Sequence, residues 1–146
     1  MLKKILLLFL VLVFAINFGC TKKVEEEPLL KNDVIVAYES NFDEEVVNVK
    51  DKYILVILYE PKCHWCKSQV DALEIFKNDR EIGNKIKIVK VNLEEEPLFI
   101  EKYRIETDPT QLLFYNGEII YRNIGYIDSP HLRQYLRPYV KFDERK

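Results

Sequence analysis

Residues 53–67 read YILVILYEPKCHWCK and contain the most informative pattern in the chain. The run Tyr53–Tyr59 is continuously apolar and rich in β-branched and aromatic residues, which is typical of a strand buried on both faces of a sheet. After Glu60 and Pro61, residues 63–76 carry apolar side chains at helical spacing. The stretch therefore predicts a central strand that leads through a short turn into a helix beginning at a Cys-X-X-Cys motif.

Cys63 and Cys66 are the candidate reactive residues of this motif. Unpaired backbone N–H groups and the helix dipole stabilise a thiolate at a helix N-terminus, and the flanking Lys62 and Lys67 are expected to add positive potential. Two intervening residues bring the second sulfur within reach of the first, so that it can resolve a mixed disulfide. The alternative, a static structural disulfide or an inert pair, is disfavoured because an exposed Cys-X-X-Cys at a helix start is seldom structural.

The chain on either side of this stretch predicts further strands alternating with helices. Asn116-Gly117 indicates a tight hairpin turn between two strands. The resulting order, βαβαβαββα, predicts an α/β domain with a central mixed β-sheet flanked by helices. The predicted strands are residues 33–39, 53–59, 86–92, 110–115 and 118–124, and the predicted helices are residues 41–49, 63–76, 94–103 and 129–139.

Helix caps and inward-facing residues are also predicted. Asn41 or Asp43 is expected to cap the first helix, and Ser129 is expected to cap the last. Helical spacing in the last helix directs three apolar side chains towards the sheet, namely Leu132, Tyr135 and Leu136.

The N-terminal residues 1–19 have the features of an export signal. Lys3 and Lys4 precede an unbroken apolar run over residues 5–16, which is too short to span a bilayer core easily but suits a secretory signal. Gly19 stands directly before a cysteine, Cys20, as in bacterial lipoprotein signals, which are cleaved before a cysteine that is then lipidated. We therefore expect a lipoprotein-type signal peptide at residues 1–19 and lipidation of Cys20.

Two residues depart from the lipoprotein pattern. Asn17 and Phe18 occupy places where such signals usually have an aliphatic residue and a small one. An uncleaved N-terminal anchor and ordinary signal cleavage are therefore the alternatives. All three interpretations place the domain outside the cytoplasm, in the bacterial cell envelope on the periplasmic or extracytoplasmic face.

The rest of the chain divides into a tether and one domain. Residues 20–32 are charged, contain Pro28 and lack sustained periodicity, so they are predicted to form a tether, followed by a domain over residues 33–146. The chain of 146 residues is 48% hydrophobic, which suffices for one packed core. It has 24 acidic and 22 basic residues and a net charge of −2, so no nucleic-acid partner is expected.

Residues 34–140 resemble the thioredoxin superfamily in three features. The first is the hydrophobic strand leading into the cysteine motif. The second is Thr107-Asp108-Pro109-Thr110 before the strand sequence QLLFYNGE. The third is the run from Tyr121 to Gly125 and Tyr126, followed by a capped helix. The resemblance implies the thioredoxin fold.

The resemblance also implies roles for individual residues. Cys63 is the expected nucleophile that attacks a substrate disulfide, and Cys66 is the expected resolving residue, so that the two form a redox disulfide. Pro109 matches the family's cis-proline, which packs against the sulfurs, shields them from metal and shapes a substrate groove. Asp108 is expected to offer backbone groups to an extended substrate segment. No cofactor and no metal are expected.

Departures from the family pattern surround the same residues. Many members bury an aspartate six residues before the first cysteine, where this chain has Ile57, so proton transfer is expected to use another route such as Glu60 or water. Asp108 puts a carboxylate beside the dithiol, and its charge is expected to raise the pKa of a neighbouring thiol. For His64, tuning of the thiolate and simple exposure to solvent remain open, whereas Trp65 is expected to shape the substrate surface.

Taken together, these features predict an exported, membrane-tethered thiol–disulfide oxidoreductase with a leaning towards reduction. The expected partners are thiols and disulfides of exported proteins, a membrane or soluble redox partner that recycles the dithiol, and the membrane through a lipid anchor. The alternatives are binding of a soft metal such as copper by Cys63, Cys66 and His64, and a redox-silent adaptor with the same fold.

Overall fold

The computed structural model describes residues 34–140. The predicted signal peptide, the tether and Cys20 lie outside the described residues. Within residues 34–140, no helix is both long enough and apolar enough to cross a membrane.

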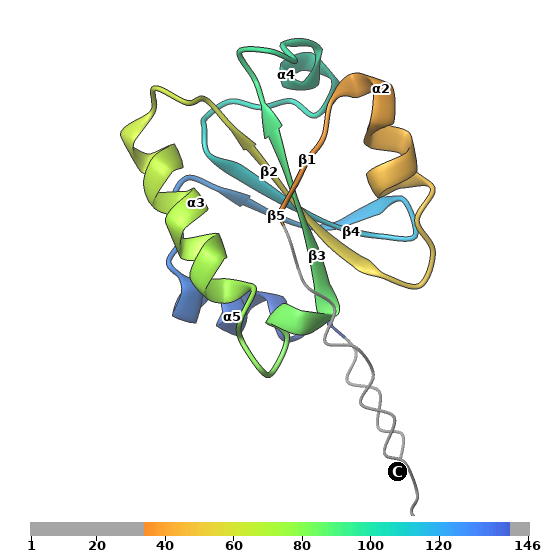
Figure 1. Cartoon of the computed structure of the whole chain (residues 1–146), viewed down its shortest axis with the longest axis vertical. Helices are drawn as coiled ribbons and strands as arrows, with labels where there is room; N and C mark the ends of the chain where they lie inside the picture. Colours follow the sequence, from red (N-terminus) through yellow and green to blue (C-terminus); the bar gives the residue numbers. More distant parts are fainter. Residues whose placement is uncertain (1–33, 141–146) are drawn as a thin grey trace, which may run out of the picture.

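A single five-stranded mixed sheet forms the centre of the domain (Figure 1). Its strand order is β1-β3-β2-β4-β5, with β1, β3 and β2 parallel, and with β4 antiparallel to β2 and β5 antiparallel to β4. The strands are β1 (Ile35–Val36), β2 (Tyr53–Tyr59), β3 (Ile86–Asn92), β4 (Thr110–Tyr115) and β5 (Glu118–Ile124). This arrangement is the thioredoxin fold and confirms the predicted mixed sheet.

The helices cover both faces of this sheet. Figure 1 shows α3 and α5 together on one side, and α2 and α4 towards the other. The helices are α2 (Glu39–Phe42), which continues into a π-helical segment (Asp43–Val47), α3 (His64–Phe76), α4 (Leu98–Lys102) and α5 (Ser129–Leu136). A short 3₁₀ turn (Gly83–Lys85) precedes β3.

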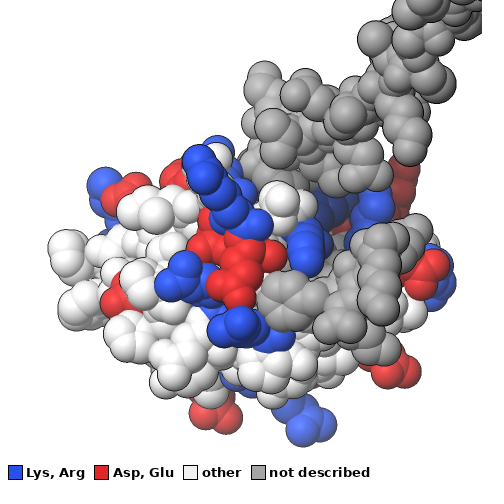
Figure 2. All heavy atoms as spheres, turned by 90° about the horizontal axis from the view of Figure 1, so that it is seen from below, with Lys and Arg blue, Asp and Glu red and all other residues white. Residues whose placement is uncertain are grey.

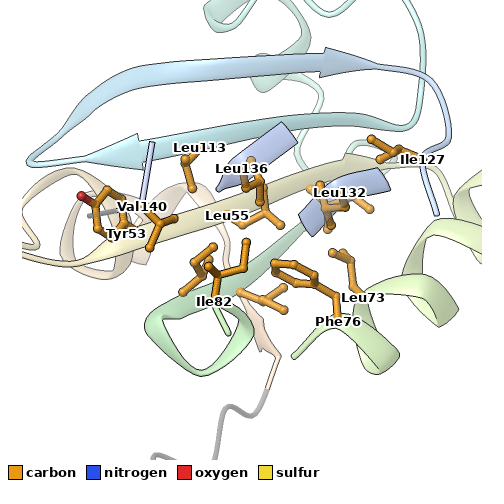
Figure 3. Close-up of a cluster of buried hydrophobic side chains, with 13 residues drawn as sticks. Tyr53, Leu55, Leu73, Phe76, Ile82, Leu113, Ile127, Leu132, Leu136 and Val140 are labelled. Atoms are coloured by element: carbon orange, nitrogen blue, oxygen red, sulfur yellow. The ribbon is translucent and has the colours of Figure 1, made fainter. Parts of the chain in front are cut away.

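Side chains of the central strand alternate between two buried clusters. Leu55 and Ile57 of β2 pack in the α3–α5 core, together with Phe76 of α3 (Figure 3). Ile54 and Val56 point the other way into the α2–α4 core. Residues 53–58 are buried throughout, which explains why the strand is apolar at every position rather than at alternate ones.

The α2–α4 core is built around an aromatic cluster. Phe42 of α2 lies edge-on to Phe99 of α4, with ring centroids 4.8 Å apart, and edge-on to Phe114 of β4, at 6.0 Å. Tyr103 follows α4, and its ring centroid lies 5.7 Å from that of Phe42. These rings join α2 and α4 to the sheet on the side opposite α3.

Two predictions about the first strand and the first helix are wrong. Neither Asn41 nor Asp43 is its cap, because the helix begins earlier, after Tyr38. The side-chain oxygen of Asn41 instead accepts the Tyr38 backbone N–H at 2.8 Å, which satisfies an amide that the helix leaves unpaired. The preceding strand is also shorter than predicted, since only Ile35 and Val36 pair with β3.

The last helix differs from the prediction in its cap and in one inward residue. Asp128, not Ser129, is the N-cap, and its carboxylate accepts the His131 backbone N–H at 3.0 Å. Leu132 and Leu136 are buried as predicted, but Tyr135 is 48% exposed. The two leucines are one helical turn apart and form the buried stripe of this short helix, and Tyr135 lies outside that stripe.

Ion pairs connect the segment after α3 to the end of α5. Arg133 contacts Asp79 at 3.2 Å, and Arg137 contacts Glu81 at 2.9 Å. Figure 2 shows acidic and basic side chains intermixed on the underside of the molecule. Such exposed pairs contribute little to stability individually, about 0–1 kcal/mol, so the two hydrophobic cores hold the layers together.

Candidate active site

The two cysteines lie at the junction between β2 and α3. Cys63 is the N-cap of α3 and has an extended backbone, and the backbone N–H of Cys66 donates to Cys63 Sγ at 3.1 Å. Cys63 is half-buried, whereas Cys66 is 0% exposed, and both are free thiols. A thiol that caps a helix accepts a hydrogen bond from an otherwise unpaired amide, so the predicted placement of the first sulfur at a helix tip is confirmed.

The loop before β4 approaches the dithiol from across the sheet. Thr110 pairs with Leu58 near the end of β2, so the residues before Thr110 lie beside the turn that leads into α3. The Asp108–Pro109 peptide bond is cis, and Pro109 is buried. Residues separated by more than forty positions in sequence are thereby brought into contact.

Asp108 contacts both sulfurs through different atoms. Its backbone carbonyl accepts from Cys63 Sγ at 3.9 Å, and its carboxylate Oδ2 accepts from Cys66 Sγ at 3.0 Å. The two sulfurs and the carboxylate oxygen all lie within 4.8 Å of one another. A carboxylate beside the dithiol was expected, and the structure identifies Cys66 as the thiol that it contacts. The expected pairing of the Asp108 backbone with a substrate segment stays a prediction.

The buried Cys66 thiol and the Asp108 carboxylate shift each other's pKa. Burial raises the pKa of Cys66 strongly, and hydrogen bonds with Cys63 and Asp108 raise it further. Burial also acts to raise the pKa of Asp108, but hydrogen bonds from Cys66 and Cys63 outweigh burial and lower it below its usual value. At neutral pH the site therefore holds a neutral Cys66 thiol against an ionised carboxylate.

The two lysines that flank the cysteines are each paired with an acidic side chain. Lys62 is turned outward, with its side chain 87% exposed, and its ammonium contacts Glu94 at 3.2 Å. Lys67 contacts Asp71 at 3.3 Å, one helical turn further along α3. Each positive charge is thus partly offset by an acidic partner, and the expected positive potential at the dithiol stays a prediction.

A shallow groove adjoins the dithiol on its exposed side. Trp65 is 58% exposed, and its ring packs against Tyr126 with centroids 5.7 Å apart. His64 is exposed and lies edge-on to Trp65 at 5.5 Å, so the structure places it facing solvent. The groove is lined by Trp65, Thr107, Asp108, Pro109, Gly125 and Tyr126.

Gln69, a buried polar residue that holds the segment after β5, was missed. The Gln69 side chain accepts the Ile127 N–H at 2.8 Å and donates to the Ile127 carbonyl at 3.1 Å. The Gly125 N–H donates to the Pro109 carbonyl at 2.8 Å, and its φ of +86° explains why glycine stands there. Gln69 shares the buried stripe of α3 with Cys66 and Leu73, and a polar residue on such a stripe is the pattern that could have identified it.

The donor atoms at the site match the copper hypothesis only in the two sulfurs. The third group near the two sulfurs is a carboxylate oxygen from Asp108, and the solvent-facing His64 is not part of this cluster. Copper(I) is a soft ion that prefers thiolate and thioether ligands to carboxylates.

Known proteins resemble the chain over nearly all of the described domain. A family model described as Thioredoxin matches residues 33–138. The thioredoxin of Buchnera aphidicola subsp. Acyrthosiphon pisum is 33% identical over 105 residues, covering 72% of this chain and 94% of the relative. That of Buchnera aphidicola subsp. Schizaphis graminum is 32% identical and covers 75% and 99%, and that of Bacillus subtilis is 26% identical and covers 73% and 98%. With its cysteine pair at the start of α3 and the cis-proline loop opposite, the chain belongs to the thioredoxin family and is a thiol–disulfide oxidoreductase.

Proposed function

We propose that this protein is an exported, membrane-tethered oxidoreductase that reduces disulfides in exported proteins, with Cys63 as nucleophile and Cys66 as resolving residue. The observation that carries the proposal is the unequal exposure of the two sulfurs. Cys63 is half-buried and contacts Asp108, which lines the groove, whereas Cys66 is fully buried. A substrate disulfide in the groove therefore meets Cys63 first, and only the mixed disulfide at Cys63 lies within reach of Cys66.

The groove supports a protein substrate. Its exposed aromatic rings, Trp65 and Tyr126, offer an apolar contact surface, and the Asp108–Pro109 loop presents backbone groups that an extended chain could pair with. The dithiol must be reduced again after each turnover, which requires a separate thiol-bearing redox partner at the membrane or in solution.

The carboxylate of Asp108 supports the reducing direction. A dithiol becomes a strong oxidant when its reduced form is stabilised as a thiolate. Here an ionised carboxylate lies 3.0 Å from Cys66 Sγ, which disfavours negative charge on the reduced pair. The dithiol is thereby biased towards donating its electrons.

The reduction potential of the Cys63–Cys66 pair tests this direction. We expect a value near that of a reducing thioredoxin, about −270 mV, rather than near that of a strong oxidant, about −120 mV. The measurement is equilibration of the full chain with glutathione or dithiothreitol buffers, followed by alkylation of free thiols. Cys66→Ser serves as the control, because it cannot form the internal disulfide. A potential close to the oxidant value would contradict the reducing role.

Membrane tethering is proposed from the N-terminal sequence. Cys20 follows a short apolar segment, and acyl chains contribute about 0.8 kcal/mol per buried CH₂ to membrane binding. In bacterial cells we expect the wild-type protein to fractionate with membranes and to incorporate labelled palmitate. The Cys20→Ser variant is expected to carry no labelled palmitate and to keep its signal peptide uncleaved. Equal labelling of the two proteins would exclude lipidation at Cys20.

A further inference from the structure

We propose that Asp108 is a catalytic residue that accepts the proton of the Cys66 thiol when Cys66 attacks the mixed disulfide at Cys63. This inference rests on the proposed roles of the two cysteines and adds a proton acceptor to them. The carboxylate touches a reacting atom directly, with Oδ2 3.0 Å from Cys66 Sγ. That distance is within the range over which a general base acts.

The resolving step needs a proton acceptor because of where Cys66 lies. Its side chain is 0% exposed, so bulk water does not contact the thiol freely. The strand beneath the site contributes no acid there, since Ile57 of β2 is also fully buried and apolar. The proton must therefore leave through a neighbouring protein group or through water in a cavity.

Other titratable groups surround Cys66 but are less well placed. A second cavity is lined by Tyr59, Glu60, Pro61, Cys66, Lys67, Val70, Asp71 and Lys90. On the groove side, Tyr126 lies beside Asp108, and Cys63 caps the same helix. Among the described residues, Asp108 supplies the carboxylate that is hydrogen-bonded to Cys66 Sγ.

The protonation states of the pair suit the step. Burial raises the pKa of Cys66, so at neutral pH the attacking sulfur still carries a proton that must be removed. Despite its burial, Asp108 has a lowered pKa because the thiols donate to it, so it is ionised and able to accept that proton. Formation of the S–S bond withdraws electrons from Cys66 Sγ, so proton transfer becomes favourable as the bond forms.

The step balances without any further reactant. Cys66 Sγ forms a bond to Cys63 Sγ, and the bond between Cys63 Sγ and the substrate sulfur breaks. The Cys66 proton moves to Asp108, and the substrate sulfur leaves with the electron pair and takes a proton from Asp108. Over the cycle the two cysteines are oxidised to a disulfide, and the substrate disulfide gains two electrons and two protons. In the reverse direction the protonated Asp108 donates to Cys66.

A purely electrostatic role for Asp108 predicts the opposite effect of mutation. If the carboxylate only raises the pKa of Cys66, Asp108→Asn produces more Cys66 thiolate and accelerates resolution. If the carboxylate accepts the proton, Asp108→Asn slows resolution even though the pKa of Cys66 falls. The sign of the rate change therefore separates the two roles.

The experiment measures attack by the two cysteines separately. Full-length reduced protein with Cys20→Ser is mixed with dithiobis(nitrobenzoate), and release of the coloured thiol is followed in stopped flow. The first release reports attack by Cys63, and the second reports resolution by Cys66. We expect Asp108→Asn to slow the second release by a factor on the order of 10² at neutral pH, and to affect the first release much less.

The pH profile provides a second readout. In the wild type, the second release is expected to change little between about pH 6 and 8, because the pKa of Asp108 lies below this range and the base stays ionised. In Asp108→Asn it is expected to rise about tenfold per pH unit, because only the thiolate then reacts. A wild-type second release that already rises about tenfold per pH unit would overturn the proposal, even if Asp108→Asn failed to fold.

Two variants serve as controls. Asp71→Asn removes a carboxylate that lines the Cys66 cavity without a hydrogen bond to the thiol, and both releases should persist. Asp108→Glu keeps a carboxylate and should retain part of the resolution rate. An unchanged or faster second release in Asp108→Asn refutes the role of Asp108 alone. If the first release in the wild type does not come from attack by Cys63, the proposed function is refuted instead.

Discussion

Replacing Cys63 by serine is expected to lower the rate of disulfide reduction by at least about 10⁴-fold, because a hydroxyl cannot replace the sulfur that forms the mixed disulfide. Cys63 is the half-exposed sulfur of the pair and accepts the Cys66 amide at 3.1 Å. The measurement is reduction of insulin by the full chain with dithiothreitol as electron source, corrected for the rate with dithiothreitol alone.

The matched variant is Cys66→Ser. It retains the nucleophile and lacks the buried resolving thiol, so it is expected to accumulate a mixed disulfide with its substrate. That product is detected by mass as a covalent adduct at Cys63 and is released by reductant. The assigned roles would be contradicted if Cys63→Ser still reduced insulin. They would also be contradicted if the wild type formed its first adduct at Cys66.

Truncating Phe42 to alanine is expected to reduce the free energy of unfolding by about 3–5 kcal/mol. Phe42 is 1% exposed and contacts Phe99, Tyr103 and Phe114, so its removal leaves a cavity between α2, α4 and the sheet. A typical domain has only about 5–15 kcal/mol of stability in total, so this loss is a large fraction of it.

Urea unfolding monitored by circular dichroism measures this effect. Leu98→Ala is the matched control, because Leu98 lies on α4 beside Phe99 but is 60% exposed, and its change should stay within about 0.5 kcal/mol. Equal losses from both substitutions would show that the α2–α4 core does not stabilise the domain in the way the ring contacts imply.

Much of the fold could be predicted from local patterns. An unbroken apolar run predicted β2 with its correct bounds, and its burial on both faces is what such a run requires. Asn116-Gly117 predicted the hairpin between β4 and β5, and both residues have the positive φ that a tight hairpin needs. The resemblance identified Pro109, and the structure places it in a cis bond after Asp108, which contacts both sulfurs.

Caps and short helices were predicted less well, because neighbouring polar residues compete for the same role. Asp128 rather than Ser129 caps α5, since either residue type can accept a helix amide and only the backbone path of the preceding loop selects between them. Tyr135 was assigned to the core on spacing alone, but the buried residues of the short helix are Leu132 and Leu136.

The sequence by itself determined the order of strands and helices, the hairpin and the position of the two cysteines at a helix start, because each depends on residues near one another in the chain. Only the tertiary structure decided that Lys62 turns to Glu94 and that Asp108 reaches Cys66. The second contact depends on the register of β4 against β2, in which Thr110 pairs with Leu58. Side-chain chemistry does not specify such a register locally, since it arises when the two hydrophobic cores pack against the sheet.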